Sequence, residues 1–426
     1  MEHNKFYILK EFFLKNISAK QIVLKNTFWL FLGEVFIRFF KFFLVVFGAR
    51  ILGPEGWGSF QYVLSIAAFF FIFSDLGIDY LVIRDYQQKE DFKERINTGS
   101  FIREILAFIS LIIALVFSLF FENPDFQKTF ILLSLFLFLG NLKNYLISFF
   151  QAIQKMERQF IIVFVESLLT LIFGIIFLLI FKNIISFAVA YFFGILFSFI
   201  VGLFLAKNFL YYLNPKFNFE FFKYYFHSGL PLALFGTLGF VFFTADQIIL
   251  GKLKGVEAVG YYSVSNRVIL FLITLSSLFL YSLLPQIALN ISNKERLKTI
   301  LKKSIFFIIL INSLFFVSVL FLADFLPLLF GEKYIPSIQP LKLLSFILFL
   351  IPLTSLFDNF LFSINKQWQN FFITIFCAVL NVILNLELIP SYAIFGAIYA
   401  TLISQLINLI LTSMLSYRYF KLLNER

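Results

Sequence analysis

The first long apolar stretch of the chain contains three charged residues at helical spacing. Glu34, Arg38 and Lys41 are four and three residues apart, so in a helix over residues 26–48 they share one face. A charge at the centre of a membrane helix costs about 2.5 to 3.5 kcal/mol on insertion scales, so each one needs an ionic partner, water or a ligand. An Arg38–Glu34 pair would leave Lys41 uncompensated. This face predicts a cavity that receives an anion; an ion pair that aids assembly is the alternative.

Arg267 lies on a second polar face, in a helix predicted over residues 258–289. The same face carries Ser263, Thr274, Ser277 and Tyr281. A guanidinium in an apolar segment indicates either contact with a substrate or a structural ion pair. Both interpretations remain open for Arg267.

A third polar stripe follows the helix predicted over residues 129–153. Its members recur at spacings of three and four: Asn141, Asn144, Ser148, Gln151 and Lys155. Amides and hydroxyls in such a line can bind sugar hydroxyls, and they serve equally well as hydrogen bonds between helices. Lys143 lies about 200 degrees from Asn141 around this helix, so Lys143 and the stripe are not expected to face the same cavity.

Simpler explanations apply to the other ionisable residues of the apolar segments. Three long side chains at predicted helix starts are expected to reach the membrane interface: Arg103, Glu104 and Lys342. A helix-end turn is favoured over cation binding for Asp75 and Asp79, and a structural polar contact is favoured over ion coupling for Asp246. Three carboxylates have no evident partner in the sequence: Glu166, Asp358 and Glu387.

Composition places the chain in a membrane. Hydrophobic residues make up 61% of the 426 residues, charged residues make up 14%, and the mean hydropathy is +0.92. Apolar runs of about 20 residues can be counted as membrane helices. The sequence predicts an all-α integral membrane protein with twelve transmembrane helices, over residues 26–48, 57–81, 100–121, 129–153, 160–181, 185–206, 226–251, 258–289, 304–323, 341–363, 370–389 and 393–416.

Lys and Arg predict the orientation of these helices. They concentrate in the polar breaks on the side of both tails, so both termini are expected to be cytoplasmic. The polar stretch around Asn214-Pro215 divides the helices into two sets of six. The predicted organisation is a cytoplasmic amphipathic segment (1–25), an N-lobe (26–206), a cytoplasmic linker (207–223), a C-lobe (224–416) and a cytoplasmic tail (417–426).

The chain contains an internal repeat. Gly53-Pro54-Glu55-Gly56-Trp57-Gly58-Ser59-Phe60 returns as Gly255-Val256-Glu257-Ala258-Val259-Gly260-Tyr261-Tyr262. Further along, Gln159-Phe160-Ile161-Ile162 corresponds to Asn370-Phe371-Phe372-Ile373. Because helix number and orientation agree in both halves, the repeat predicts two six-helix lobes related by a pseudo-two-fold axis along the membrane normal.

Several motifs, in their order, resemble bacterial polysaccharide-biosynthesis flippases. They are Ser74-Asp75-Leu76-Gly77-Ile78 with Arg84, Glu257-Ala258-Val259-Gly260-Tyr261-Tyr262 with Arg267, and Asn381-Val382-Ile383-Leu384-Asn385 through Ile389-Pro390 to Gly396-Ala397. The chain looks like Wzx-type transporters of undecaprenyl-diphosphate-linked oligosaccharides, in the superfamily that includes lipid II flippases and MATE drug exporters. The resemblance implies two lobes in a V that alternate access to a central cationic cavity, with Arg267 facing the cavity.

The resemblance predicts a flippase of the bacterial inner membrane that supports cell-surface polysaccharide synthesis. The expected substrate-binding residues are Arg38, Lys41, Arg267, Asn144, Ser148 and Gln151. A guanidinium such as that of Arg267 can bind a diphosphate through two parallel hydrogen bonds. The expected partners are a polyprenyl-diphosphate-linked glycan, membrane lipids and glycan polymerase or transferases; no nucleic acid is expected, because the net charge of +11 reflects the membrane orientation.

Two other functions are compatible with parts of the sequence. A MATE-like ion-coupled antiporter shares the twelve helices, but it should present carboxylates to organic cations. A membrane-bound polymerase or ligase would normally need a large outer loop, whereas the predicted outer breaks are short. The sequence has no phosphate-binding loop and no His or Cys cluster at metal-ligand spacing, so no catalysis, cofactor or bound metal is expected.

Overall fold

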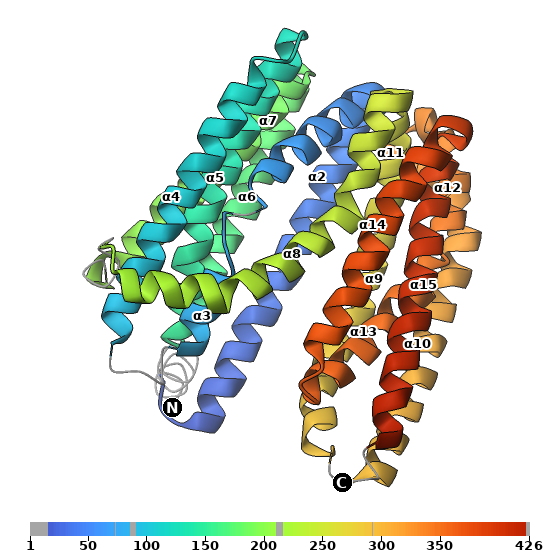
Figure 1. Ribbon diagram of the computed structural model, residues 1–426. Helices are drawn as coiled ribbons and strands as arrows, with labels where there is room; N and C mark the ends of the chain where they lie inside the picture. The colour runs from blue at the N-terminus through green and yellow to red at the C-terminus, as the bar shows by residue number, and fades with distance from the viewer. Residues whose placement is uncertain (1–15, 73, 86–90, 210–215, 292, 423–426) are drawn as a thin grey trace, which may run out of the picture. The chain divides into compact units, whose positions relative to one another are not determined.

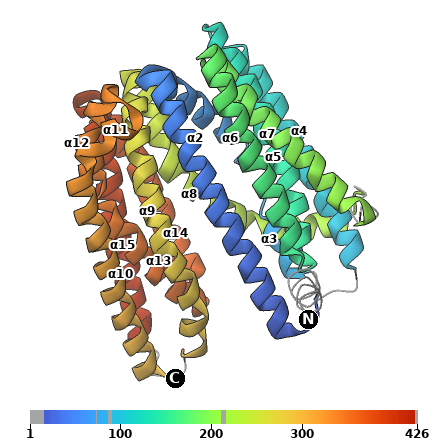
Figure 2. The same ribbon diagram turned by 180° about the vertical axis from the view of Figure 1, so that it is seen from behind.

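The computed structural model describes residues 16–72, 74–85, 91–209, 216–291 and 293–422, and these residues form helices without any strand. Figures 1 and 2 show the helices from opposite sides. Their bounds are α2 (Ala19–Phe70), α3 (Ile78–Asp85), α4 (Phe92–Ser118), α5 (Pro124–Ala152), α6 (Met156–Phe181), α7 (Ile184–Ala206), α8 (Phe219–Lys254), α9 (Val256–Leu289), α10 (Lys294–Leu322), α11 (Leu326–Phe330), α12 (Ile338–Leu344), α13 (Ile347–Ser363), α14 (Gln367–Tyr392) and α15 (Ile394–Leu422).

Many of these helices are suited to a membrane. Within the described residues, eight helices are long and apolar enough to cross a bilayer, or up to nine if Glu332–Leu344 and Ile347–Ser363, bent by 42°, form one span. The prediction of an all-helical membrane protein is therefore confirmed. The twelve spans and the pseudo-two-fold axis stay predictions.

Helix α2 differs from the two separate spans predicted at its position. It runs through 52 residues and is kinked at Gly53, where φ is 68° and ψ is 177°. Glycine adopts this conformation without the steric cost of a side chain. The helix then ends at Phe70 instead of continuing to residue 81. Leu76 and Gly77 have φ values of 47° and 69°, which a right-handed helix cannot contain, so the remainder forms a turn and α3.

The chain divides into two compact units. The first unit comprises residues 1–52 and 63–237, and the second comprises residues 53–62 and 238–426. The chain passes between the units three times, twice inside α2 and once inside α8. The first unit contains α3 to α7, and the second contains α9 to α15.

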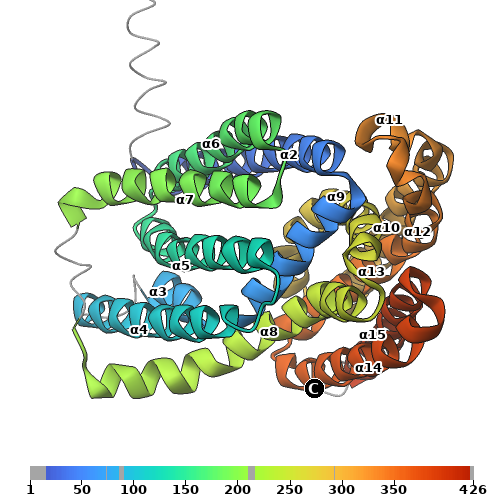
Figure 3. The ribbon, with the colours of Figure 1, turned by 90° about the horizontal axis from the view of Figure 1, so that it is seen from above.

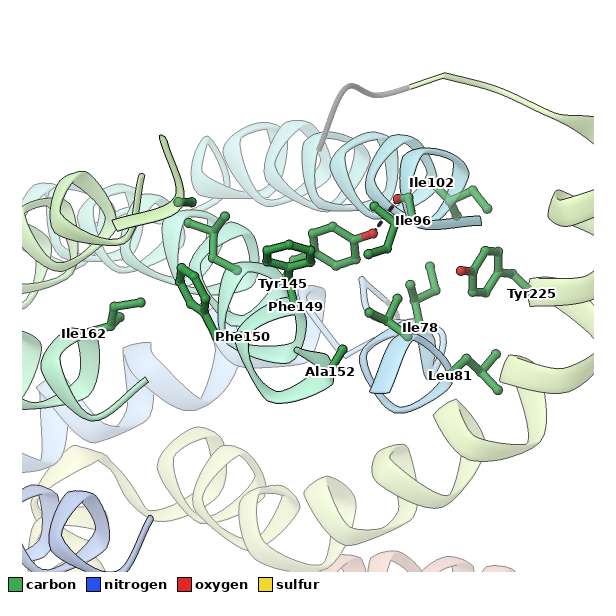
Figure 4. Close-up of a cluster of buried hydrophobic side chains, with 13 residues drawn as sticks. Ile78, Leu81, Ile96, Ile102, Tyr145, Phe149, Phe150, Ala152, Ile162 and Tyr225 are labelled. Carbon is green, nitrogen blue, oxygen red and sulfur yellow. Dashed lines mark hydrogen bonds between the residues drawn. The ribbon is translucent and has the colours of Figure 1, made fainter. Parts of the chain in front are cut away.

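The core of the first unit fixes the position of α5. Buried side chains from α3, α4, α5 and α8 pack together there, as Figure 4 shows. The Tyr145 hydroxyl on α5 donates a hydrogen bond of 2.5 Å to the carbonyl oxygen of Ile96 on α4. Phe149 and Phe150 follow on the same helix and are almost fully buried. Such close packing on one side of α5 determines which of its other side chains face α3 and which face α6.

In the second unit, the two copies of the repeat pack against each other through glycine. A Cβ atom on Gly58 would lie 1.8 Å from the carbonyl oxygen of Val256, and one on Gly260 would lie 2.0 Å from that of Pro54. Gly58 corresponds to Gly260 in the repeat, and Pro54 corresponds to Val256. The contacts are therefore exchanged between equivalent positions, which is the pattern of a two-fold interface.

We predict that a single methyl group at this contact destabilises the protein. Gly58→Ala and Gly260→Ala should each lower the unfolding temperature in detergent by several degrees, because backbone atoms must move apart. Gly140→Ala is the matched control, since a Cβ there meets nothing within 4 Å. The close approach would be refuted if all three variants unfolded like the wild type.

Candidate functional site

A polar cavity lies within the first unit, among α2, α5, α6 and α7. Its volume is about 150 Å³, and its charged lining residues are Lys41, Lys143 and Glu166. The Lys143 Nζ atom is 2.5 Å from the Glu166 Oε2 atom. Two ammonium groups and one carboxylate give this lining a formal charge of +1. A cavity of this kind, surrounded by apolar helices, favours an anion or the polar part of a larger molecule.

Close packing of α6 on α7 forms one wall of the cavity. A Cβ atom on Gly194 of α7 would lie 2.0 Å from the Thr170 Oγ1 atom of α6, so glycine is needed for this approach. Thr170 and Tyr191 thereby line the same cavity. At the turn between these helices, the Asn183 side chain accepts a hydrogen bond of 2.8 Å from the Ser186 backbone and caps α7. Figure 3 shows α5, α6 and α7 side by side.

A smaller pocket adjoins this cavity, and its lining includes Glu34, the acidic member of the charged pair of α2. Both pockets share Ile37 and Val163 in their linings, and the smaller one includes Glu34 and Gln159. The Arg38 Nη2 atom lies 2.7 Å from the Glu34 Oε2 atom, so the ion pair offered as the alternative is present. The Arg38 Nε atom is buried and has no hydrogen-bond partner among the described residues.

The polar stripe of α5 mostly makes contacts within the protein. The Ser148 hydroxyl donates to Asp79 at 3.2 Å, and the Gln151 amide donates to the side chain of Gln159 at 2.8 Å. Asn144 is exposed. Lys143 points to the cavity, away from Ser148. The structure thus brings Lys41 and Lys143 together, whereas Ser148 faces α3, and Gln151 reaches only the wall of the smaller pocket.

Arg103 overturns the prediction that it reaches the membrane interface. Its side chain is 2% exposed and forms ion pairs with Asp75 and, at 3.0 Å, with Asp79. Its second nitrogen also donates to the Asn141 carbonyl oxygen at 3.3 Å. The prediction was wrong because α4 begins at Phe92, so Arg103 lies about three turns inside the helix.

Glu166 was also misjudged, because its partner lies on another helix. The spacing of charges within one helix cannot show the Lys143–Glu166 pair. One signal in the sequence could have found it: two opposite charges stand near the middle of consecutive apolar segments, each without a partner of its own. Lys143 is the functional candidate that was missed.

In the second unit, Arg267 contacts the residue that follows the first repeat copy. Its Nη2 atom donates to the Gln61 Oε1 atom at 3.2 Å; Gln61 is buried, and Arg267 is exposed. Ser263 accepts a hydrogen bond of 3.0 Å from the buried Trp57 indole. The side chains of Ser277 and Tyr281 lie outside the described residues. Arg267 therefore keeps an exposed surface while Gln61 orients its guanidinium.

Asp246 forms a closed polar cluster between four helices. Its carboxylate accepts hydrogen bonds from Tyr262 at 2.6 Å, Asn385 at 2.6 Å and Thr401 at 2.7 Å. The residue is 1% exposed. A structural polar contact was the prediction for Asp246, and these contacts confirm it. Within the described residues, no group of three or more His, Cys, Asp or Glu side chains could hold a metal ion.

Comparison with protein families gives a clear result. The model of the family described as polysaccharide biosynthesis protein matches residues 23–291, which is more than half of the chain. The chain belongs to the polysaccharide biosynthesis protein family. The MatE family model also matches, over residues 231–386. The resemblance drawn from the sequence motifs is thereby confirmed.

Relatives of this polysaccharide biosynthesis protein agree with both matches. The capsular polysaccharide biosynthesis protein CapF of Staphylococcus aureus is 25% identical over 411 residues, which are 93% of this chain and 99% of that protein. An inward-facing multidrug resistance MATE family transporter of the MOP superfamily has a TM-score of 0.75 at 14% identity, covering 91% of this chain and 96% of its own. A Pyrococcus furiosus MOP transporter, described as having a binding pocket of reverse polarity, has a TM-score of 0.64 at 14% identity, covering 97% and 98%. The fold is that of a MATE-like membrane transporter.

The buried ion pairs of this polysaccharide biosynthesis protein lead to a stability prediction. Arg103→Met should cost about 3 to 5 kcal/mol, because Asp75 and Asp79 lose their buried cation. Lys342→Met is the control: its partner Asp324 is 64% exposed, so the loss should stay below about 1 kcal/mol. Unfolding in mild detergent measures both changes.

A rescue experiment distinguishes the loss of charge from the loss of packing in Arg103→Met. Adding Asp75→Asn and Asp79→Asn to Arg103→Met should recover much of the lost stability. Equal unfolding of Arg103→Met and Lys342→Met would contradict the interpretation of Arg103 as a buried charge.

Proposed function

We propose that this protein translocates undecaprenyl-diphosphate-linked oligosaccharides across the bacterial inner membrane for cell-surface polysaccharide synthesis. The observation that carries the proposal is the cavity of the first unit, in which Lys41 and Lys143 outnumber the carboxylate of Glu166. The family match supports a role in polysaccharide synthesis, and the fold supports transport. A diphosphate that joins a lipid to a sugar is the anion that such a cavity suits.

The proposed mechanism is alternating access. Twelve helices in two lobes, related by a pseudo-two-fold axis, would expose the cavity to one side of the membrane and then to the other. Arg38, Lys41 and Arg267 would bind the diphosphate, and Asn144 and Gln151 would contact the glycan; Ser148, which is buried and bonded to Asp79, would contribute by positioning α5. The polyprenyl chain would stay in the lipid. Glycan polymerase or transferases are the proposed partners, and both termini of the chain would be cytoplasmic.

Export of organic cations is the second candidate function, because the MatE model and the MATE structures match. A cation exporter needs a carboxylate that is free to bind its substrate. In the cavity described here, Glu166 already pairs with Lys143. The sign of the lining charge therefore favours an anionic substrate. The family and the fold are those of transporters, and this argues against a polymerase or ligase.

Charge removal at the proposed site should reduce transport. Lys41→Gln should slow flipping of a lipid-linked glycan in proteoliposomes by about tenfold, since one charge-assisted contact is worth about 1.5 to 3 kcal/mol. Arg267→Ala should lose more activity than Arg267→Lys, because lysine keeps the charge without the planar fork. Lys128→Gln, at an exposed position on the first turns of α5, is the control and should transport normally.

Each variant must first reach the membrane at the wild-type level. Normal glycan transport by both Lys41→Gln and Arg267→Ala would reject this mechanism of recognition. Export of an organic cation by the wild-type protein, without flipping of lipid-linked glycan, would reject the proposed function in favour of the antiporter.

The orientation can be tested independently. Reporter fusions inserted within residues 207–223 and after Arg426 should both report a cytoplasmic location, because Lys and Arg concentrate on that side. An external location for either fusion would reject the proposed threading of the chain.

A further inference from the structure

A second cavity, of about 420 Å³, lies on the second unit among α10, α13 and α15. Helix α13 packs against both α10 and α15, and Figure 3 shows it beside them. Phe357 and Phe360 of α13 and Met414 of α15 contribute to a lining that is mostly apolar. Met414 is 63% exposed, so the cavity opens to the surface of the unit. In a membrane protein, an exposed apolar surface favours contact with lipid.

Two lysines stand at the edge of this apolar cavity. Lys298 and Lys302 are four residues apart on α10, so they project from the same face, one turn apart. Both are exposed, and neither forms an ion pair within the part of the chain that the structure describes. An apolar wall with paired cations at one end is complementary to a molecule that has an anionic head and a hydrocarbon tail.

A buried hydroxyl in the lining also lacks a partner. Ser416 on α15 is 3% exposed and lines the cavity, and its Oγ atom makes no hydrogen bond with any described residue. Buried hydroxyl groups in proteins nearly always have a partner. An oxygen of a bound ligand would supply one.

The sequences of α10 and α15 beside the cavity change between apolar and basic or aromatic residues, as is expected at the depth of a lipid headgroup. Helix α10 is basic up to Lys303 and almost wholly apolar beyond it, so Lys302 lies where the helix would enter hydrocarbon. On α15, the apolar stretch gives way at Ser416 to Tyr417, Arg418 and Tyr419. Aromatic and basic residues are typical of the membrane interface.

We propose that this cavity binds an anionic phospholipid of the surrounding bilayer. Its phosphate would lie between Lys298 and Lys302, an ester oxygen would accept from Ser416, and an acyl chain would cover the wall formed by Phe357, Phe360 and Met414. Free phosphate would leave that wall empty, and a neutral lipid would leave the lysines unmatched. Basic pockets between membrane helices bind acidic lipids in this way. The proposal is independent of the transported substrate.

The test uses the intact protein in detergent with added phosphatidylglycerol or phosphatidylcholine, followed by native mass spectrometry. Lys298→Ala/Lys302→Ala should reduce the phosphatidylglycerol retained by about tenfold, corresponding to the loss of two charge contacts. Arg296→Ala/Lys303→Ala is the matched control; it removes two charges from the same turns of α10, outside the lining, and should change retention less than about twofold. Equal losses in both double variants, or equal retention of the two lipids by the wild type, would overturn the proposal.

A second variant tests the apolar wall without changing charge. Ser413 lines the cavity, so Ser413→Trp should fill it and displace phosphatidylglycerol while both lysines remain. Undiminished retention by this variant would overturn the placement of the acyl chain. Phosphatidylglycerol should also raise the unfolding temperature of the wild type and of Arg296→Ala/Lys303→Ala, but not of Lys298→Ala/Lys302→Ala. Displacement of phosphatidylglycerol by equimolar polyprenyl phosphate would assign the cavity to the carrier lipid and overturn the proposal.

Discussion

Charge inside apolar surroundings must be neutralised locally, and this requirement determines how the helices of the first unit meet. Arg103 of α4 pairs with Asp79 of α3, Lys143 of α5 pairs with Glu166 of α6, and Lys25 of α2 pairs with Glu157 of α6. Each pair joins two different helices. Removing one partner leaves an uncompensated buried charge. Rotating or shifting either helix would separate the pair and destabilise the fold for the same reason. The pairs thus fix which helix faces are in contact, and hydrophobic packing alone would fix these faces less strictly.

The same electrostatic requirement determines the formal charge of the cavity lining that a substrate would contact. Glu166 pairs with Lys143 within the cavity of the first unit, and together with Lys41 the lining carries two formal positive charges and one negative charge. In the second unit, the only charge of the Asp246 cluster is surrounded by hydroxyl and amide donors and is 1% exposed. Glu166 and Asp246 therefore make structural contacts, whereas Lys41 and Arg267 are exposed. This difference between acidic and basic residues is the physical basis for preferring an anionic substrate.

Long apolar runs were sufficient to predict most of the helices. Residues 129–153 and 160–181 correspond closely to α5 (Pro124–Ala152) and α6 (Met156–Phe181), because about 20 apolar residues specify a membrane helix almost by themselves. The separation of α3 from α2 was missed, since it depends on the left-handed backbone at Leu76 and Gly77. Helical spacing also separated Lys143 from the stripe on α5. It could not pair Lys143 with Glu166. A contact between two helices depends on how each helix is rotated about its axis and how deep each residue lies in the membrane, and spacing within one helix specifies neither.

The glycine contact explains why the repeat is still visible in the chain. Gly58 and Gly260 each pack against the backbone of the other copy, so a side chain at either position would displace a carbonyl group. Other corresponding positions differ where their surroundings differ: Phe60 has no hydroxyl, whereas the Tyr262 hydroxyl donates to Asp246. Two positions without room for a Cβ atom accept glycine alone. The two copies of the repeat are therefore expected to match where they contact each other most closely.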